Sequence, residues 1–274
     1  MENKKVLFVS QEITPYLPEN EMSRIGRNLP QRIQEKGREI RTFMPKFGCV
    51  KERRNQLHEV IRLSGMNVII DDSDHPLIIK VASIQSARMQ VYFIDNEEYF
   101  QRKAFLIDEL GEAFEDNDER SIFFVKGVLE TVKKLGWSPD IIHCHGWMSA
   151  LLPLYLKTTY KDDPLFNQSK IVYSAFSDTP NGDLDKDLKA KLQFDEVGED
   201  VLKHLDTISY DGLHKSAIEL SDAIVIGDEN LSEDVQNFIA EKGCLSLVHE
   251  NDPDEYAEPF ERFYDEILEK ISAE

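Results

Sequence analysis

Cysteines, cations and long apolar runs are all scarce in this sequence, and each shortage argues against a class of protein. The 274 residues hold only three cysteines (Cys49, Cys144 and Cys244), so no disulfide framework is predicted and a reducing cytoplasm is the expected compartment. Lys and Arg number 32 against 52 Asp and Glu, a net charge of −20, which argues against nucleic-acid binding. No apolar run reaches the length of a membrane span, and the one near the N-terminus is too short for a signal peptide.

Glycine-rich phosphate loops and hydrolase motifs are also missing. The sequence has no G-x-x-x-x-G-K-[ST] segment and no G-x-S-x-G segment. The loop after the first apolar run has no glycine before Gly26, and it carries Glu12, Glu19 and Glu21. Because carboxylates repel phosphate, we do not expect a phosphate cradle in this loop.

Short apolar runs alternate with amphipathic segments through most of the chain. Residues 4–10 form a β-rich run, a polar loop follows, and apolar residues recur at helical spacing within 22–36. Residues 37–45 bring a glycine and then a second strand. The chain therefore opens as strand, loop, helix and strand.

The middle of the chain changes pattern before the alternation returns. Strands without a long helix between them predict a hairpin-rich excursion at 57–63, 67–71, 75–84 and 88–95. A strong amphipathic helix is expected at 116–137, with Asp116 or Asn117 able to cap it. Strands are then expected at 139–145, 169–176, 222–227 and 244–250, and helices at 147–160, 210–221, 230–243 and 252–271.

This order predicts an α/β fold with a mainly parallel sheet covered on both faces. The architecture that fits best is a Rossmann-like, doubly wound domain. Ligands of such folds bind beyond the carboxyl ends of the strands. Function is therefore sought in the loops that follow residues 10, 145, 176 and 227.

The segment "IIHCHGWMSALLPLYL" (141–156) is the most suggestive of these strand ends. Side chains alternate along a strand, so His143 and His145 share a face while Cys144 points the other way. Two imidazoles can bind a metal, but the other histidines are isolated, so we expect no metal site and favour a buried pair bonded to backbone. Trp147 has an aromatic face that suits sugars, although a core position at a helix start is the favoured interpretation.

The acidic stretch 178–200 raises the possibility of a divalent cation. It lacks the D-x-[DN]-x-[DN]-G order of a calcium loop. A solvated loop with a short helix is the better interpretation, and no cofactor is expected.

Several stretches, in order, resemble the N-terminal half of bacterial glycogen and plant starch synthases. The matching pieces are "KVLFVSQEITPYLPENEMSRIGRNLP", "GREIRTFMPKFG", "VYFIDNEEYFQR", the long segment 116–166, "KIVYSAF" and "DGLHKSAIELSDAIVIGDENLSEDV". The resemblance implies one half of a GT-B glycosyltransferase, a family that uses ADP-glucose to extend α-1,4-glucan.

The chain departs from the family at the positions that the resemblance marks as functional. The family's K-T-G-G motif is matched by Pro18, Glu19, Asn20 and Glu21. Its aspartate in H-x-H-D-W-H is matched by Gly146 and its second histidine by Met148. The histidine of T-[VI]-H-N is matched by Phe176. Phosphate affinity and a polar group near the transition state are therefore expected to be lost.

The resemblance also implies a domain organisation. We expect residues 1–250 to form the Rossmann-like half, without the family's ADP-glucose-binding second domain. Residues 251–274 are expected to form an amphipathic helix that packs back on it, as the final helix of GT-B enzymes does. An unrelated C-terminal helix is the alternative.

Three functions fit these observations. The favoured one is a non-catalytic homologue that binds α-glucan (glycogen) or a protein partner. The second is an ADP-glucose-dependent glucosyltransferase that acts with a donor-binding half in trans, and the third is an unrelated small-ligand binder. Self-association is a further expectation, without nucleic acid or membrane as partner. The candidate cleft residues are Glu12, His143, His145, Trp147 and Ser177.

Overall fold

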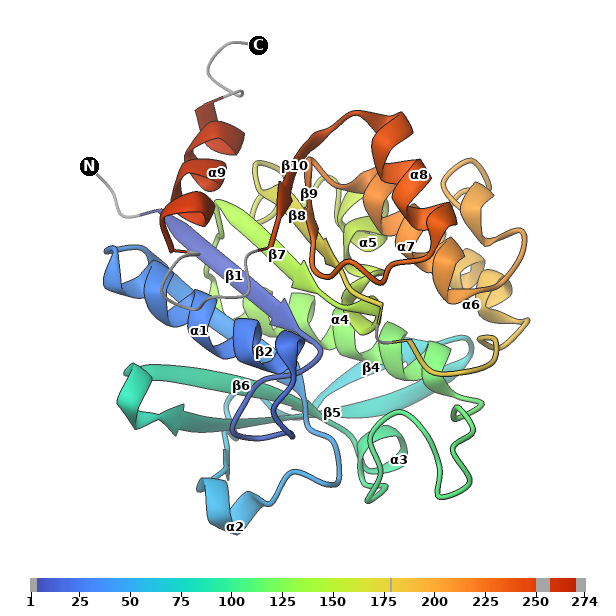
Figure 1. Ribbon diagram of the computed structural model, residues 1–274. Coiled ribbons are helices and arrows are strands. Elements are labelled where there is room, and N and C mark those ends of the chain that lie inside the picture. Colours follow the sequence, from blue (N-terminus) through green and yellow to red (C-terminus); the bar gives the residue numbers. More distant parts are fainter. Residues whose placement is uncertain (1–3, 178, 250–256, 270–274) are drawn as a thin grey trace.

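The computed structural model describes residues 4–177, 179–249 and 257–269. Within them lies a ten-stranded sheet in the order β10-β9-β8-β7-β1-β2-β6-β5-β3, with β4 paired to β5 (Figure 1). The strands that run parallel to a neighbour are β1 (Lys5–Ser10), β2 (Glu39–Pro45), β6 (Met89–Asp95), β7 (Ile141–His145), β8 (Lys170–Ala175), β9 (Ala223–Ile226) and β10 (Leu245–Val248). The predicted, mainly parallel sheet is confirmed.

The hairpin-rich excursion predicted between residues 57 and 95 is also confirmed. The strands β3 (His58–Glu59) and β4 (Met66–Ile70) pair antiparallel with β5 (Ser73–Ile84), which in turn pairs antiparallel with β6. One edge of the sheet therefore departs from the parallel pattern, while the centre, β1 and β7, keeps it.

Helices cover both faces of the sheet (Figure 1). The helices α1 (Glu21–Glu35) and α9 (Ala257–Glu269) contact each other on one face. The other face is covered by α4 (Asn117–Leu135), α5 (Leu152–Lys157) and α7 (Tyr210–Leu220). The remaining helical segments are α2 (Glu52–Asn55), α3 (Glu97–Phe100), α6 (Leu188–Phe194), α8 (Glu233–Lys242) and the short 3₁₀ turns η1 (Gln85–Ala87), η2 (Trp147–Ser149) and η3 (Lys203–Leu205).

Alternation along the central strand divides the core between the two faces. In β1, Val6 and Phe8 lie in the apolar cluster beneath α1 and α9, whereas Leu7 and Val9 lie in the larger cluster beneath α4. All four side chains are fully buried. A strand that is apolar on both faces must be covered on both, which is the position that β1 has in the sheet.

The helix expected at 147–160 is shorter than predicted. The chain makes the 3₁₀ turn η2 after Gly146, and α5 begins only at Leu152, with Pro153 in its first turn. Proline is tolerated there because the first helical N–H groups lack partners in any case. Leu154 and Tyr155 are nevertheless fully buried, so the predicted apolar face is real.

The helix α9 closes the face that α1 leaves open. Its buried side chains Phe260, Phe263, Tyr264 and Ile267 join the cluster that contains Phe8. Both Glu261 and Asp265 accept hydrogen bonds from Arg38, at 2.9 and 2.7 Å. Both ends of the expected C-terminal helix, residues 251–256 and 270–274, lie outside the described residues, and the division into 1–250 and 251–274 stays a prediction.

Candidate functional site

The loops after β1, β7, β8 and β9 gather at one edge of the sheet, because the carboxyl ends of parallel strands share an edge. Backbone bonds tie these loops together. The amide of Gln11 donates to His145 O, and that of Gly146 donates to Ser174 O. The sequence candidates therefore do belong to one region.

Glu12 is buried, only 3% exposed, and it anchors the first loop. Its carboxylate accepts hydrogen bonds from Gln11 Nε2 at 3.3 Å and from Asn20 Nδ2 at 2.6 Å. The Asn20 side chain in turn accepts from the backbone of Ser23, a capping box that starts α1. Pro18 lies exposed in this loop, with its carbonyl accepting from Ser23 Oγ.

The two strand-end histidines are fully buried beneath α9. The Nδ1 and Nε2 atoms of His143 lie 2.6 Å from Tyr264 Oη and 2.7 Å from Ser174 Oγ, and Nδ1 of His145 lies 3.0 Å from Ser10 Oγ. The expected backbone partners are therefore wrong: the partners are hydroxyl groups, of Ser10 and Ser174 on the neighbouring strands β1 and β8 and of Tyr264 on α9. Burial lowers the pKa of His143 well below its ordinary value and that of His145 to about 3, so both rings are neutral.

Trp147 is also fully buried, and it packs edge-on against Tyr210 with ring centroids 4.9 Å apart. Its position at the start of η2 is the core position favoured from sequence, and Cys144 is likewise a fully buried core residue. For the two histidines and Trp147, ligand contact stays a prediction.

Gly146 stands in a space that its neighbours already fill. Its φ of +81° favours glycine, and a Cβ there would lie 2.9 Å from Gln11 Oε1 and 2.9 Å from Met22 Cε. The Gln11 side chain is held in place because its Oε1 accepts a hydrogen bond from the Met148 amide. A larger side chain at 146 would have to displace both neighbours.

Phe176 turns inward, away from solvent. It is 2% exposed and belongs to the apolar cluster beneath α1 and α9. A Cβ on Gly227 would lie 2.6 Å from its ring, so the glycine makes room for the aromatic side chain. Ser177, the next residue, is exposed, and its amide donates to Asp228 Oδ2 at 2.7 Å.

A pocket of roughly 740 Å³ opens beside Ser177, between the ends of β9 and β10 and the helix α8. Its apolar wall includes Ile226, Ile239 and Val248. Its polar lining includes Glu21, Asp228, Glu229, Asn230, Gln236, Ser246 and His249. Among the described lining residues none is Lys or Arg, so the pocket offers carboxylates and amides but no cation for a phosphate.

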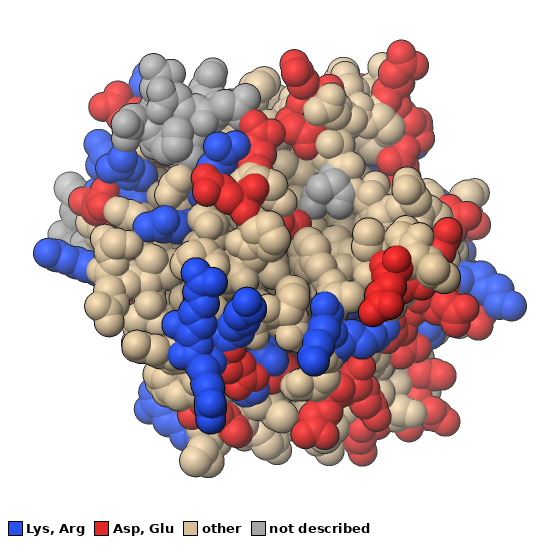
Figure 2. Space-filling view, turned by 60° about the horizontal axis from the view of Figure 1, so that its bottom comes forward, with Lys and Arg blue, Asp and Glu red and all other residues tan. Residues whose placement is uncertain are grey.

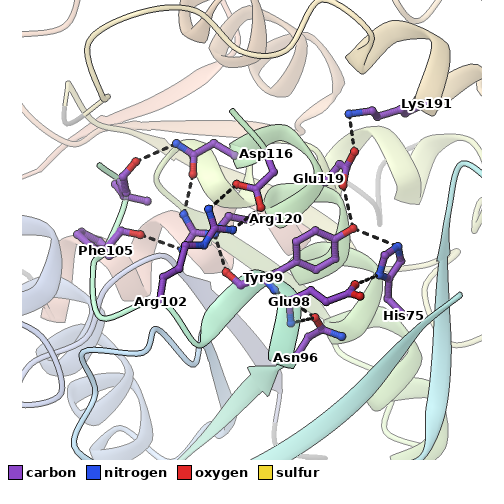
Figure 3. Close-up of polar contacts among 12 residues, drawn as sticks. His75, Asn96, Glu98, Tyr99, Arg102, Phe105, Asp116, Glu119, Arg120 and Lys191 are labelled. Atoms are coloured by element: carbon purple, nitrogen blue, oxygen red, sulfur yellow. Dashed lines mark hydrogen bonds and ion pairs between the residues drawn. The ribbon is translucent and has the colours of Figure 1, made fainter. Parts of the chain in front are cut away.

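A second polar centre surrounds Arg120 at the start of α4 (Figure 3). The guanidinium is 1% exposed and donates to Tyr99 O, Asn117 Oδ1 and Phe105 O, at 2.7 to 2.9 Å. Burial lowers its pKa to about 10. Three aromatic rings, of Phe47, Phe100 and Phe114, lie within 5.4 Å of the charge.

Next to Arg120, a chain of ionisable groups joins α4 to α6 (Figure 3). Lys191 Nζ lies 2.8 Å from Asp118 and 2.7 Å from Glu119, and Glu119 accepts a hydrogen bond from Tyr99 Oη. Burial raises the pKa of Asp118 to about 6, against the lowering effect of Lys191. The sequence pattern predicts residues 116–120 only as the start of a helix. The available signal was an arginine on the apolar side of an amphipathic helix, which needs buried partners.

The described chain gives no sign of a metal or a membrane. No group of three or more His, Cys, Asp or Glu side chains in these residues is placed to hold a metal ion. No helix among them is long and apolar enough to cross a membrane.

Comparison with known proteins places this geometry in context. Residues 5–250 match the starch synthase catalytic domain family. The chain is 36% identical over 236 residues to the glycogen synthase of Chlorobium luteolum and 42% identical over 171 residues to that of Chlorobaculum tepidum. These matches cover 85% and 62% of this chain but 48% and 35% of the relatives. The chain thus spans about half the length of the first of them.

Solved structures give the same fold. The catalytic domain of starch synthase IV from Arabidopsis thaliana, bound to ADP and acarbose, superposes with a TM-score of 0.72 at 17% identity, covering 90% of this chain and 52% of that one. Sucrose-phosphate synthase from Thermosynechococcus elongatus gives a TM-score of 0.52 at 11% identity, covering 97% and 99%. These likenesses confirm the predicted Rossmann-like half of a GT-B fold.

Proposed function

Because the chain belongs to the starch synthase catalytic domain family, we propose that it is a non-catalytic member that binds α-glucan at the carboxyl edge of its sheet. The observation that carries the proposal is the pocket beside β9 and α8. Carboxylates and amides line this pocket, and none of its described lining residues is Lys or Arg. Carboxylate and amide oxygens accept hydrogen bonds from sugar hydroxyls, and an apolar wall suits the C–H faces of a sugar. A neutral glucan therefore fits where a diphosphate does not.

Loss of transfer activity is supported by three positions that the resemblance marks as functional. Pro18 supplies no cation, and Gly146 has no side chain and no free space for one. Phe176 is packed into the core instead of facing the cleft. Removing one group that stabilises a transition state commonly lowers the rate about 10²-fold or more, and these departures act together.

Charge at this edge supports the same conclusion. The first loop carries Glu19 and Glu21, and the next loops bring Asp228 and Glu229. Like charges raise the free energy of a bound diphosphate, whereas an uncharged glucan is unaffected. The proposal therefore separates the two classes of ligand cleanly.

Co-sedimentation with glycogen tests the binding claim. We expect the wild-type chain to pellet with glycogen, and the double variant Glu229→Ala/Asn230→Ala to bind about tenfold or more weakly, since two hydrogen-bonding groups are lost. A matched control, Gln193→Ala/Asp162→Ala, changes exposed residues outside the pocket and should leave binding unchanged. Equal loss in both variants, or no binding by the wild-type chain, would contradict the proposal.

The competing function is a glucosyltransferase that acts with a donor-binding half supplied in trans. Membership of the family favours it, since the sheet and its carboxyl edge are retained. Labelled ADP-glucose, glycogen and the separately purified second half of a relative provide its test. Incorporation that appears only when this chain is added would establish the competing function and overturn the non-catalytic one.

A further inference from the structure

One face of the molecule carries separated regions of opposite charge (Figure 2). Lys and Arg gather in a band over α2, whereas Asp and Glu predominate on the other side of the same face. This separation stands out in a chain whose net charge is −20.

The basic half is formed by residues 51–62. Four cations in this stretch are exposed, and the Ile61 side chain between them in the chain is 83% exposed. The cations are Lys51, Arg53, Arg54 and Arg62. An exposed aliphatic side chain among charges is the composition of an interface anchor with a polar rim.

These four cations are not neutralised within the described chain. No ion pair joins any of them to a carboxylate among those residues. The carboxylate that α2 itself supplies, Glu52, is already bound by Lys46 Nζ at 2.8 Å and Lys80 Nζ at 2.7 Å. The remaining neighbour, Glu59, offsets only part of the charge.

The acidic half is the loop at residues 107–115. Glu109, Glu112 and Glu115 are exposed there, and the Leu110 side chain is 86% exposed. The loop has a defined shape, because Asp108 Oδ1 accepts hydrogen bonds from the amides of Leu110 and Glu112 at 2.8 and 2.9 Å. The acidic half therefore has the same composition as the basic half but the opposite charge, since each has one exposed aliphatic side chain among exposed charged residues.

Packing fixes the two halves relative to each other. The ring centroids of Phe47 and Phe105 lie 4.5 Å apart, edge to face, between the loop before α2 and the segment that leads into the acidic loop. A Cβ on Gly48 would lie 2.1 Å from Arg102 O, so the two backbones are in close contact. Both halves are thus displayed together on one rigid surface.

We propose that this face is a self-complementary interface through which two copies of the chain form a two-fold symmetric dimer. A two-fold axis places the basic half of one copy against the acidic half of the other, and the reverse contact forms at the same time. Each copy then brings Ile61 to a surface that carries Leu110. A second copy is favoured over another partner because both complementary halves are present on the same face of this one chain.

Charge reversal tests the pairing. The variant Arg53→Glu/Arg54→Glu carries two acidic halves, and Glu109→Arg/Glu112→Arg carries two basic ones. We expect each variant alone to dimerise at least about tenfold more weakly than the wild type in sedimentation equilibrium. An equimolar mixture of the two variants should recover the dimer, because each acidic surface then meets a basic one.

The control reverses charges at the opposite edge of the sheet. Lys36 follows α1 and Lys161 follows α5, both at the amino ends of strands, and both are exposed. The variant Lys36→Glu/Lys161→Glu should dimerise as the wild type does. The wild-type dimer should weaken as salt is raised from about 0.05 to 0.5 M, because exposed charges are screened.

Three results overturn the proposal. One is a wild-type chain that stays monomeric up to a concentration of about 1 mM, where the free energy of association is only ~4 kcal/mol. In that case the basic half would be free to bind an acidic partner. Another is a dimer whose stability neither reversal changes. The third is a mixture of the reversed variants that associates no better than either one.

Discussion

At the scale of single residues, neighbouring side chains occupy the space at the carboxyl edge where the resemblance implies an open cleft. Glu12, which a cleft would expose, is bonded to Asn20 and anchors the first loop. Gly146 is surrounded by Gln11 and Met22, and Phe176 is part of the core. Gly146 and Phe176 form a consistent pair, because packing fills both positions at which the resemblance implies a polar side chain.

Placing an aspartate at Gly146, as the resemblance to the family implies for this position, should therefore destabilise the protein. The variant Gly146→Asp places a Cβ 2.9 Å from Gln11 Oε1 and adds strain at φ +81°. Overpacking of this kind costs about 1–3 kcal/mol beyond the backbone strain. Thermal unfolding of the variant measures the loss.

Gly37→Asp is the matched control for that variant. Gly37 has φ +96° and nothing within 4 Å of a built Cβ, so it carries the strain without the crowding. Gly146→Asp should lower Tm by several degrees more than Gly37→Asp, at about 2–4 °C for each kcal/mol. Equal losses would show that the space around Gly146 is not filled.

The buried histidines predict a loss of stability in acid. The folded-state pKa of His145 is about 3, below the ordinary 6.5, and that of His143 is also lowered well below 6.5. Below pH 6.5 the two imidazoles take up protons in the unfolded chain but stay neutral in the folded one. The free energy of unfolding therefore falls by about 1.4 kcal/mol per pH unit for each ring. Asp118 acts in the opposite sense, since its folded pKa of about 6 exceeds the ordinary 3.8.

Burial also lowers the pKa of His214 and of His249 to about 4, so four rings act against one carboxylate and stability should fall between pH 6.5 and 5. Urea unfolding at pH 7 and pH 5 measures the change. The variant His145→Gln should lose less stability over this interval than the wild type, whereas His58→Gln, which alters an exposed histidine, should lose as much. Stability that rises as the pH falls from 7 to 5 would contradict burial of neutral imidazoles.

Residue environments were the part that sequence predicted least well. The pattern placed Trp147 in the core and showed that His143 and His145 share one strand face while Cys144 lies on the other. It did not reveal Arg120, whose partners at Tyr99 and Phe105 come from a separate segment. Contacts between distant segments depend on tertiary packing, which local periodicity does not encode.

At the scale of elements, apolar patterns and turn residues located the strands and the longer helices, but not the short helices α2 and α3. Strands apolar on both faces, such as β1, and the β5–β6 hairpin were predicted with the correct type and order. The main error was the helix at 147–160. The apolar pattern runs through this whole segment, but Gly146 and Pro153 limit the α-helix to Leu152–Lys157. Glycine and proline residues determine where a helix begins and ends more than whether it forms.

The element with the sharpest consequence is α9. Four of its side chains are at most 5% exposed against the cluster that contains Phe8, and they are Phe260, Phe263, Tyr264 and Ile267. Truncation after Val248 uncovers that cluster, so we expect aggregation or a large fall in Tm. Thermal unfolding and light scattering of the truncated chain check this, and unchanged melting would rule out a structural role for α9.

A milder change, at Arg38, separates the contribution of ion pairs from that of apolar packing in holding α9. Arg38→Met keeps most of the apolar stem and removes the ion pairs with Glu261 and Asp265, at 2.9 and 2.7 Å. Because Asp265 is largely exposed, the loss should be about 1 kcal/mol, far below that of truncation. Urea unfolding that gives equal losses for the two variants would show that charge, not packing, holds the helix.

At the scale of the whole molecule, fold and charge both support the proposed binding of glucan. The sheet is that of the family, but its carboxyl edge carries an acidic first loop and a pocket without a described cation. The proposed function therefore requires that neutral glucan and nucleotide sugar are discriminated by the sign of the electrostatic field rather than by shape. This is the central claim.

Calorimetric titration of the wild-type chain with maltoheptaose and, in matched runs, with ADP-glucose tests that claim most directly. We expect saturable heat for maltoheptaose that is lost in Glu229→Ala/Asn230→Ala, and no measurable heat of binding for ADP-glucose. Binding of ADP-glucose with little or no binding of maltoheptaose would contradict it.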